Sequence, residues 1–119
     1  MQFTFFIGGY FGSHFELVLK KGELTCFFSE KNGSDAAIKY IFSIEEDPDW
    51  QLLLQFLQTL KWKKHYDNGS LDGTQWSLKF RHKDIQLNSH GSNSYPNEFK
   101  KLLQLLNTIC GKHGIPKIH

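Results

Sequence analysis

Three groups of residues combine side chains that enzymes use for catalysis. His14 and Glu16 alternate along an expected strand, so they share one face, where an imidazole and a carboxylate could exchange protons or hold a metal ion. Cys110 and His113 lie three residues apart near the end of an expected helix, a spacing that allows a thiolate–imidazole pair. His90 stands among serines in a polar segment. Acid–base, metal and nucleophilic chemistry are therefore the reactions to weigh.

None of these groups amounts to a complete active site. No third ligand accompanies His14 and Glu16, and the six histidines show no zinc-binding spacing. Cys110 continues the apolar stripe of its helix, which is typical of an inert, buried thiol. We therefore expect no catalytic residue, no metal and no cofactor, and we interpret the chain as a non-enzymatic protein.

A polar run at 89–94 is the best sequence candidate for a small-ligand site. It precedes an expected helix, whose free N–H groups and positive potential favour anions. The candidate ligand-binding residues are His90, Ser92, Asn93 and Ser94. Pro96 removes one donor, and no Gly-rich phosphate loop follows a strand. The alternative is that the Ser and Asn side chains only satisfy the start of the helix.

The charge of the chain is divided unevenly, although the net charge is only +2. Residues 1–60 carry a net charge of −4 and residues 61–119 a net charge of +6. Lys79 and Arg81 alternate with apolar residues, so they face away from the core. A nucleic acid partner or a merely solvated surface would each explain the basic half. The candidate basic surface comprises Lys61, Lys63, Lys64, Lys79, Arg81, Lys83, Lys100 and Lys101.

Hydrophobic periodicity predicts an α+β fold in the order ββββ-α-ββ-α. Apolar residues alternate in six segments, and the short connections favour an antiparallel sheet of about six strands. One helix opens at Asp47-Pro48, which suit the cap and the first turn, and ends near 63–66. The other follows Pro96 and ends before Gly111. The strands are expected at 4–8, 13–20, 23–29, 37–44, 74–81 and 84–88.

The first four strands are apolar on both faces. Opposite the main apolar row lie Phe6, Val18, Phe27 and Ile41. If one helix covers each face, these four residues belong to the core. If both helices share one face, the four residues form an exposed apolar patch suited to a homodimer or another protein partner.

A chain of 119 residues is long enough to bury a core as one domain, expected at 1–111 and followed by a flexible basic tail at 112–119. Cys26 and Cys110 are expected to be reduced and buried. No segment reaches the ~18 consecutive apolar residues of a membrane span, and the N-terminus lacks a signal-peptide pattern. We therefore interpret the chain as cytoplasmic, without a membrane partner.

Two motifs, Asp72-Gly73-Thr74-Gln75-Trp76 and Gly91-Ser92-Asn93-Ser94-Tyr95-Pro96, precede the last helix. Through them, residues 72–106 resemble a group of small uncharacterised bacterial proteins with a DGTxW strand and a GSNxYP loop before a terminal helix. The resemblance implies a stable domain of bacterial or mobile-element origin, and no established activity comes with it. We expect an interaction module with a protein partner. The alternative is a nucleic-acid-linked regulator, or a phage or mobile-element inhibitor of a nucleic-acid-processing complex, that binds RNA, DNA or a nuclease through the basic half.

Overall fold

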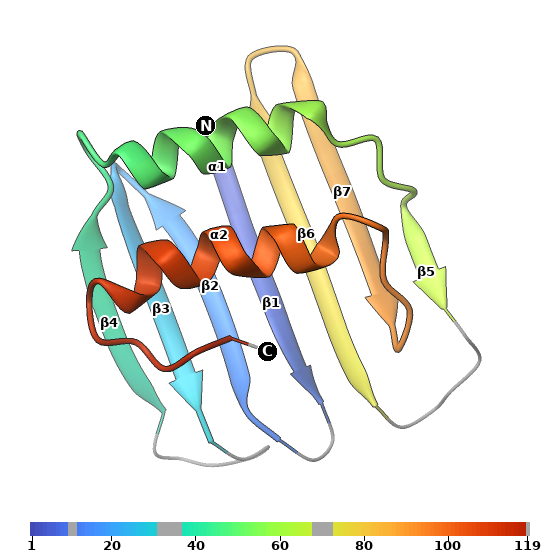
Figure 1. Ribbon diagram of the computed structural model, residues 1–119, viewed down its shortest axis with the longest axis horizontal. Coiled ribbons are helices and arrows are strands. Elements are labelled where there is room, and N and C mark those ends of the chain that lie inside the picture. Colours follow the sequence, from blue (N-terminus) through green and yellow to red (C-terminus); the bar gives the residue numbers. More distant parts are fainter. Residues whose placement is uncertain (10–11, 31–36, 68–72, 119) are drawn as a thin grey trace.

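One seven-stranded β-sheet runs through the computed structural model, which describes residues 1–9, 12–30, 37–67 and 73–118 (Figure 1). The strand order is β4-β3-β2-β1-β6-β7-β5, and neighbouring strands are antiparallel except for the parallel pair β5 and β7. The elements are β1 (Gln2–Gly9), β2 (His14–Lys20), β3 (Glu23–Ser29), β4 (Ile38–Ser43), α1 (Pro48–Thr59), β5 (His65–Asp67), β6 (Thr74–His82), β7 (Ile85–Ser92) and α2 (Phe99–Gly111).

β1 lies at the centre of the sheet, where it pairs with β2 on one side and β6 on the other. Phe3, Phe5 and Ile7 alternate along it and are almost completely buried. The same period of two places the apolar rows of β2, β3 and β6 on the same face as these residues. The strand pattern of the sequence therefore predicted the α+β class and these strands correctly.

Both helices cross the same face of the sheet (Figure 1). Trp50 of α1 packs edge-on against Phe3, with ring centroids 5.5 Å apart, and Phe99 of α2 lies 6.4 Å from Phe5. Of the two arrangements considered from the sequence, the structure therefore has the one in which the helices share a face. The alternative, with one helix on each face, is wrong.

The end of α1 and the strand after it differ from the prediction. α1 ends at Thr59, because Leu60 has an extended backbone, whereas the helix was expected to reach 63–66. The chain then runs beside β7 and forms β5, a three-residue strand that the sequence did not predict. The element order is therefore ββββ-α-βββ-α.

β7 is longer than predicted, and α2 ends later. Residues 89–92, expected in a loop, belong to β7. Two hydrogen bonds hold them there. Ser89 Oγ donates to the Lys63 carbonyl at 2.6 Å, and the His90 N–H donates to the Lys64 carbonyl at 3.0 Å. Gly111, expected just after α2, is its last residue.

Residues 112–118, expected in a flexible tail, lie against the body of the protein. Ile115 and Ile118 are buried. The Asn107 side chain donates to the Ile118 carbonyl at 2.8 Å and accepts from the Ile118 N–H at 2.7 Å. This segment therefore adds two side chains to the core.

Candidate interaction surface

The face of the sheet opposite the helices, called here the open face, carries the four residues of the predicted apolar patch. Phe27 is 37% exposed and Ile41 is 54% exposed, while Phe6 and Val18 are half-buried. The strand register makes each residue a diagonal neighbour of the next, in the order Phe6, Val18, Phe27 and Ile41. Diagonal side chains of this size lie within reach of one another. The four residues therefore form a zigzag apolar row, called here the apolar stripe, across β1, β2, β3 and β4. The residues directly opposite them on this face are polar, namely Thr4, Glu16, Thr25 and Lys39.

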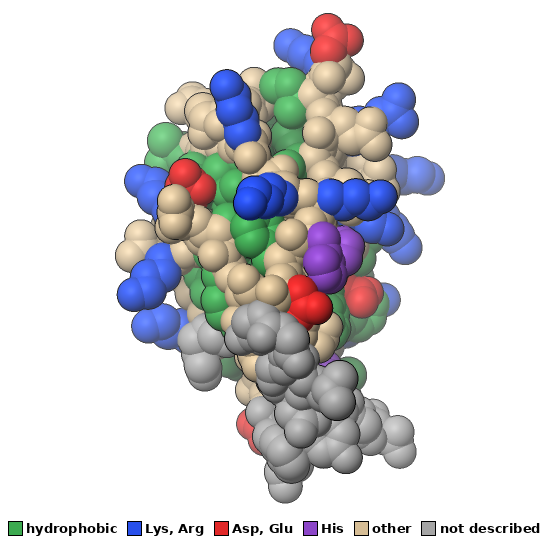
Figure 2. Space-filling view, turned by 90° about the vertical axis from the view of Figure 1, so that its right-hand side faces the viewer, with side chains coloured by type: hydrophobic (Ala, Val, Ile, Leu, Met, Phe, Trp, Pro, Cys, Tyr) green, Lys and Arg blue, Asp and Glu red, His purple; other side chains and the backbone are tan. Residues whose placement is uncertain are grey.

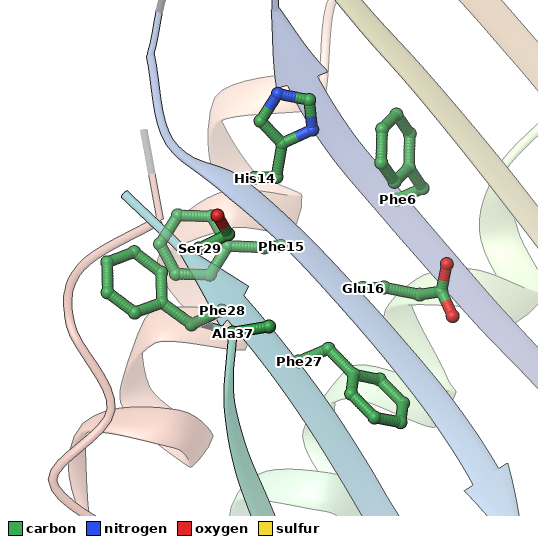
Figure 3. Close-up of a pocket in the computed structure, with 8 residues that line it drawn as sticks. All are labelled: Phe6, His14, Phe15, Glu16, Phe27, Phe28, Ser29 and Ala37. Carbon is green, nitrogen blue, oxygen red and sulfur yellow. The ribbon is translucent and has the colours of Figure 1, made fainter. Parts of the chain in front are cut away.

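A hollow of about 280 Å³ lies beside the stripe (Figure 3). Glu16 stands between Phe6 and Phe27, since it pairs with both in the register of β1, β2 and β3. Aromatic side chains make up most of the lining of the hollow, and one carboxylate lies at its wall. The hollow therefore suits an apolar side chain of another molecule. Its lining residues are Phe6, His14, Phe15, Glu16, Phe27, Phe28, Ser29 and Ala37.

His14 lines this hollow, and its contacts with neighbouring residues give it a structural role. Its Nε2 lies 2.9 Å from the Gly9 carbonyl oxygen, and its ring lies edge-on to Phe6 at 5.9 Å. The ring also covers Gly8, where an added Cβ would come within 2.6 Å of His14 Nδ1. Glu16 is exposed, and among the described residues no hydrogen bond or ion pair joins it to His14.

The two motifs of the last third of the chain contact each other. Asn93 Oδ1 accepts from the Thr74 N–H at 2.8 Å, and the Asn93 N–H donates to the Thr74 carbonyl at 2.9 Å. Trp76 Nε1 donates to the Ser94 carbonyl at 2.9 Å. Gly91 lies under the indole, because an added Cβ would come within 2.5 Å of Trp76 Nε1. The motif residues therefore join β6, the end of β7 and the segment leading to α2.

Further contacts engage the candidate ligand-binding residues. Ser92 Oγ accepts from Gln75 Nε2 at 2.9 Å, and His90 Nδ1 lies 3.1 Å from His65 Nδ1. With the bonds of Asn93 and the Ser94 carbonyl, these contacts hold strands and loop together. Anion binding by this segment stays a prediction. Asp72, which opens the first motif, lies outside the described residues.

The eight candidate basic residues are all exposed but do not form one surface. Lys79 and Arg81 project from β6 onto the open face, opposite Thr4 and Gln2 of β1. Lys100 and Lys101 belong to α2, on the other side of the sheet. Lys61, Lys63 and Lys64 follow α1, and Lys83 lies between β6 and β7. Figure 2, which looks onto the β5 edge, shows lysines and arginines spread over this side, with histidine near the middle. Among the described residues, none of the eight forms an ion pair.

Both cysteines are free and buried, as expected. Burial raises the pKa of the Cys26 thiol to about 11. Burial, and secondarily the nearby Cys26, raise the pKa of the Cys110 thiol to about 12. The His113 ring stacks on Phe42, with centroids 3.9 Å apart. These surroundings favour protonated thiols over a thiolate–imidazole pair.

The contact of β5 with β7 was not predicted from the sequence. His65 meets His90 there, and His65 Nε2 lies 3.8 Å from Asp67 Oδ2. No spacing in the sequence signals this cluster, because it depends on a strand pairing between distant segments. Within the described residues, no group of three or more His, Cys, Asp or Glu side chains could hold a metal ion.

No protein-family model matches the chain, and the search of curated proteins found no match. Among the described residues, no helix has the length and apolar character needed to span a membrane.

Proposed function

We propose that this chain is a non-enzymatic protein-binding module that recognises its partner through the open face of the sheet. The apolar stripe of Phe6, Val18, Phe27 and Ile41 carries this proposal. Phe27 and Ile41 are exposed and Phe6 and Val18 are half-buried, and such apolar side chains favour contact with another apolar surface, because each Å² removed from water contributes about 25 cal/mol. The aromatic hollow next to the stripe supplies a place for an anchoring side chain of the partner.

The surroundings of the ionisable groups support a binding role over a catalytic one. His14 is engaged with the Gly9 carbonyl, and His90 with His65. Cys110 is fully buried. Two free, buried thiols also support a cytoplasmic location, since reduced cysteines are typical of that compartment.

A capture experiment with matched variants tests this proposal. Wild type, Phe27→Asp and Leu52→Asp are immobilised and exposed to a lysate of cells that carry the gene. Leu52 is the control, because it is 52% exposed but lies on α1, away from the open face. We expect one protein to be retained by wild type and by Leu52→Asp, and to be lost with Phe27→Asp. Circular dichroism of each variant confirms that the fold is kept.

Two outcomes would remove the open face as the binding surface. One is retention of the same protein by all three forms. The other is its loss with Leu52→Asp alone, which would move the interface to the helix side.

A second candidate is binding to nucleic acid, or to a complex that handles it. Within the described part of the chain, Lys79 and Arg81 on the open face form no ion pair, which favours this possibility, because phosphates attract such cations. Wild type should then bind single-stranded RNA or duplex DNA with a steep salt dependence. Lys79→Glu with Arg81→Glu should abolish binding, whereas Lys100→Glu with Lys101→Glu, an equal charge change on the other side of the sheet, should not. Equal losses in both double variants would indicate nonspecific attraction.

A further inference from the structure

A pocket of about 470 Å³, called here the α2 pocket, lies on the helix side of the sheet beside the start of α2. α2 starts over the β6 and β7 side of the sheet and crosses it toward β4 (Figure 1). The volume falls in the range of about 300–1,000 Å³ that is typical of small-molecule sites. The walls of the pocket come from β1, β6, α2 and the segment before α2, through Ile7, Thr74, Tyr95, Pro96, Phe99 and Leu103.

Both motifs of the last third of the chain contribute to the α2 pocket. The first motif supplies Thr74 and the second supplies Tyr95. Two hydrogen bonds fix the motifs to each other, because Asn93 Oδ1 accepts from the Thr74 N–H and Trp76 Nε1 donates to the Ser94 carbonyl. The bonds that join the motifs therefore also hold two sides of the pocket at a set position.

Aromatic packing orders the apolar wall of the pocket. The centroid of the buried Phe99 ring lies 4.9 Å from that of Trp76 and 4.9 Å from that of Tyr95. Tyr95 is nevertheless 45% exposed, and Leu103, one turn further along α2, is half-buried. A ligand with an apolar body would remove both side chains from water. A wall that is already ordered lowers the entropic cost of that contact.

Lys100 gives the pocket a single cation, and Asn97 adds a neutral polar side chain. Across the described part of the chain, no hydrogen bond or ion pair engages the side chain of either residue. The neighbouring carboxylate, Glu98, accepts a hydrogen bond from Trp62 Nε1 at 2.9 Å. No acidic side chain is found among the described residues that line the pocket. The charge of Lys100 is therefore available to an anion.

We propose that the α2 pocket binds a small organic anion, whose apolar body lies against Phe99 and Leu103 and whose single carboxylate reaches Lys100. An apolar lining with one polar anchor is the usual composition of a small-molecule site. A ligand with several charges would lose hydration against the apolar walls and would find only one cation among the described lining residues. This inference goes beyond the proposed function, because the pocket and the open face lie on opposite sides of the sheet.

A titration with two matched probes tests the class of ligand. Naphthoate carries one carboxylate on an apolar ring system, and naphthamide is its neutral counterpart. Amide chemical shifts of the isotope-labelled full chain report both the position and the affinity of binding. We expect naphthoate to shift the signals of Thr74, Tyr95 and Leu103 saturably and to bind about fivefold more tightly than naphthamide. Equal affinities, saturable shifts only around Phe27 on the open face, or no saturable shift would each overturn the proposal.

Two neighbouring lysines of α2 provide a matched test of the charge. Lys100→Met removes the cation and keeps an apolar stem, so it should lower the affinity for naphthoate about fivefold and leave that for naphthamide unchanged. Lys101→Met makes the same change at an exposed position outside the lining of the pocket and should change neither affinity. Equal losses in the two variants would show general attraction to a basic helix and would contradict a site at Lys100.

Filling the pocket tests the position of the apolar body. Leu103→Trp adds bulk to the wall and should abolish binding of both probes, whereas Leu52→Trp on the exposed part of α1 should not. Retained binding by a folded Leu103→Trp would exclude the α2 pocket, and the lysine comparison decides the question if this variant does not fold. Phe27→Asp should bind both probes like wild type, so failure of this proposal is distinguishable from failure of partner capture by the open face.

Discussion

The two faces of the sheet carry similar side chains in opposite environments. Phe28 is 6% exposed, whereas its neighbour Phe27 is 37% exposed. Phe42 is 7% exposed, whereas its neighbour Ile41 is 54% exposed. Consecutive strand residues point to opposite faces, and only one face receives α1 and α2. Apolar character alone therefore does not decide burial in this protein, because the placement of the helices does.

Neighbouring phenylalanines give the largest expected contrast between the faces. Phe28→Ala should lower the free energy of unfolding by about 3–5 kcal/mol, because it leaves a cavity in the core. Phe27→Ala should lower it by less than about 0.5 kcal/mol, since its ring is partly solvated. Urea denaturation of the isolated chain at low concentration measures both. Similar losses would mean that the open face is covered in solution.

A smaller contrast is expected at neighbouring positions of β7. Gly91→Ala should cost about 1–3 kcal/mol, because the new methyl group would collide with the Trp76 indole and with the Ser94 carbonyl, 2.7 Å away. His90→Ala removes an exposed ring from the open face and, with it, only a solvent-exposed contact with His65, so it should change stability by less than about 0.5 kcal/mol. Thermal unfolding followed by tryptophan fluorescence compares the two. A neutral Gly91→Ala would show that the indole can move without cost.

Two asparagines distinguish a structural contact from a solvated one. Asn93→Ala should cost about 1–2 kcal/mol, because it leaves the Thr74 N–H without its acceptor. Asn88→Ala alters an exposed side chain of the open face and should be nearly neutral. Amide hydrogen exchange gives a second measure, since only Asn93→Ala should speed exchange at Thr74. Unchanged exchange there would argue against the contact between the motifs.

The smallest contrast is between two lysines. Lys112 Nζ lies 2.7 Å from Asp47 Oδ1 and 2.8 Å from Asp49 Oδ2, beside the start of α1. Lys112→Gln should therefore cost up to about 1 kcal/mol at neutral pH, and Lys79→Gln on the open face close to nothing. Chemical denaturation at low salt measures the difference. A loss that does not shrink in high salt would show that the Lys112 contact is not electrostatic.

The effect of Lys112→Gln should depend on pH. Partial burial opposes ionisation of Asp47, but the hydrogen bonds from Lys112 and from the Asp49 N–H prevail and lower its pKa. The stabilisation is therefore complete above the ordinary aspartate pKa and is lost as the pH falls below about 4. The same carboxylates raise the pKa of Lys112, so at high pH the contribution is lost only as that raised pKa is passed. Wild type and Lys112→Gln should thus converge in acid, and a constant difference down to pH 2 would contradict this.

Much of the fold could be predicted because its signals are local. Neighbouring residues alone show the alternation of apolar side chains that predicts β1, β2, β3 and β6. They also show Asp47-Pro48, which predicts the start of α1. β5 and the end of β7 could not be predicted this way, since polar residues occupy them and distant backbone groups hold them. The apolar stripe was predicted by residue, but its exposure depends on where both helices pack. The contact of Trp76 with Ser94 likewise joins segments that no sequence period connects.

The central position of β1 has a consequence for synthesis of the chain. β1 precedes both of its neighbours in the chain, and one of them, β6, begins only at Thr74. While residues 10–73 emerge from the ribosome, one edge of β1, from Gln2 to Gly9, has no native strand beside it. The described sheet can therefore close around β1 only after β6 has been translated, so its long-range strand pairs form late.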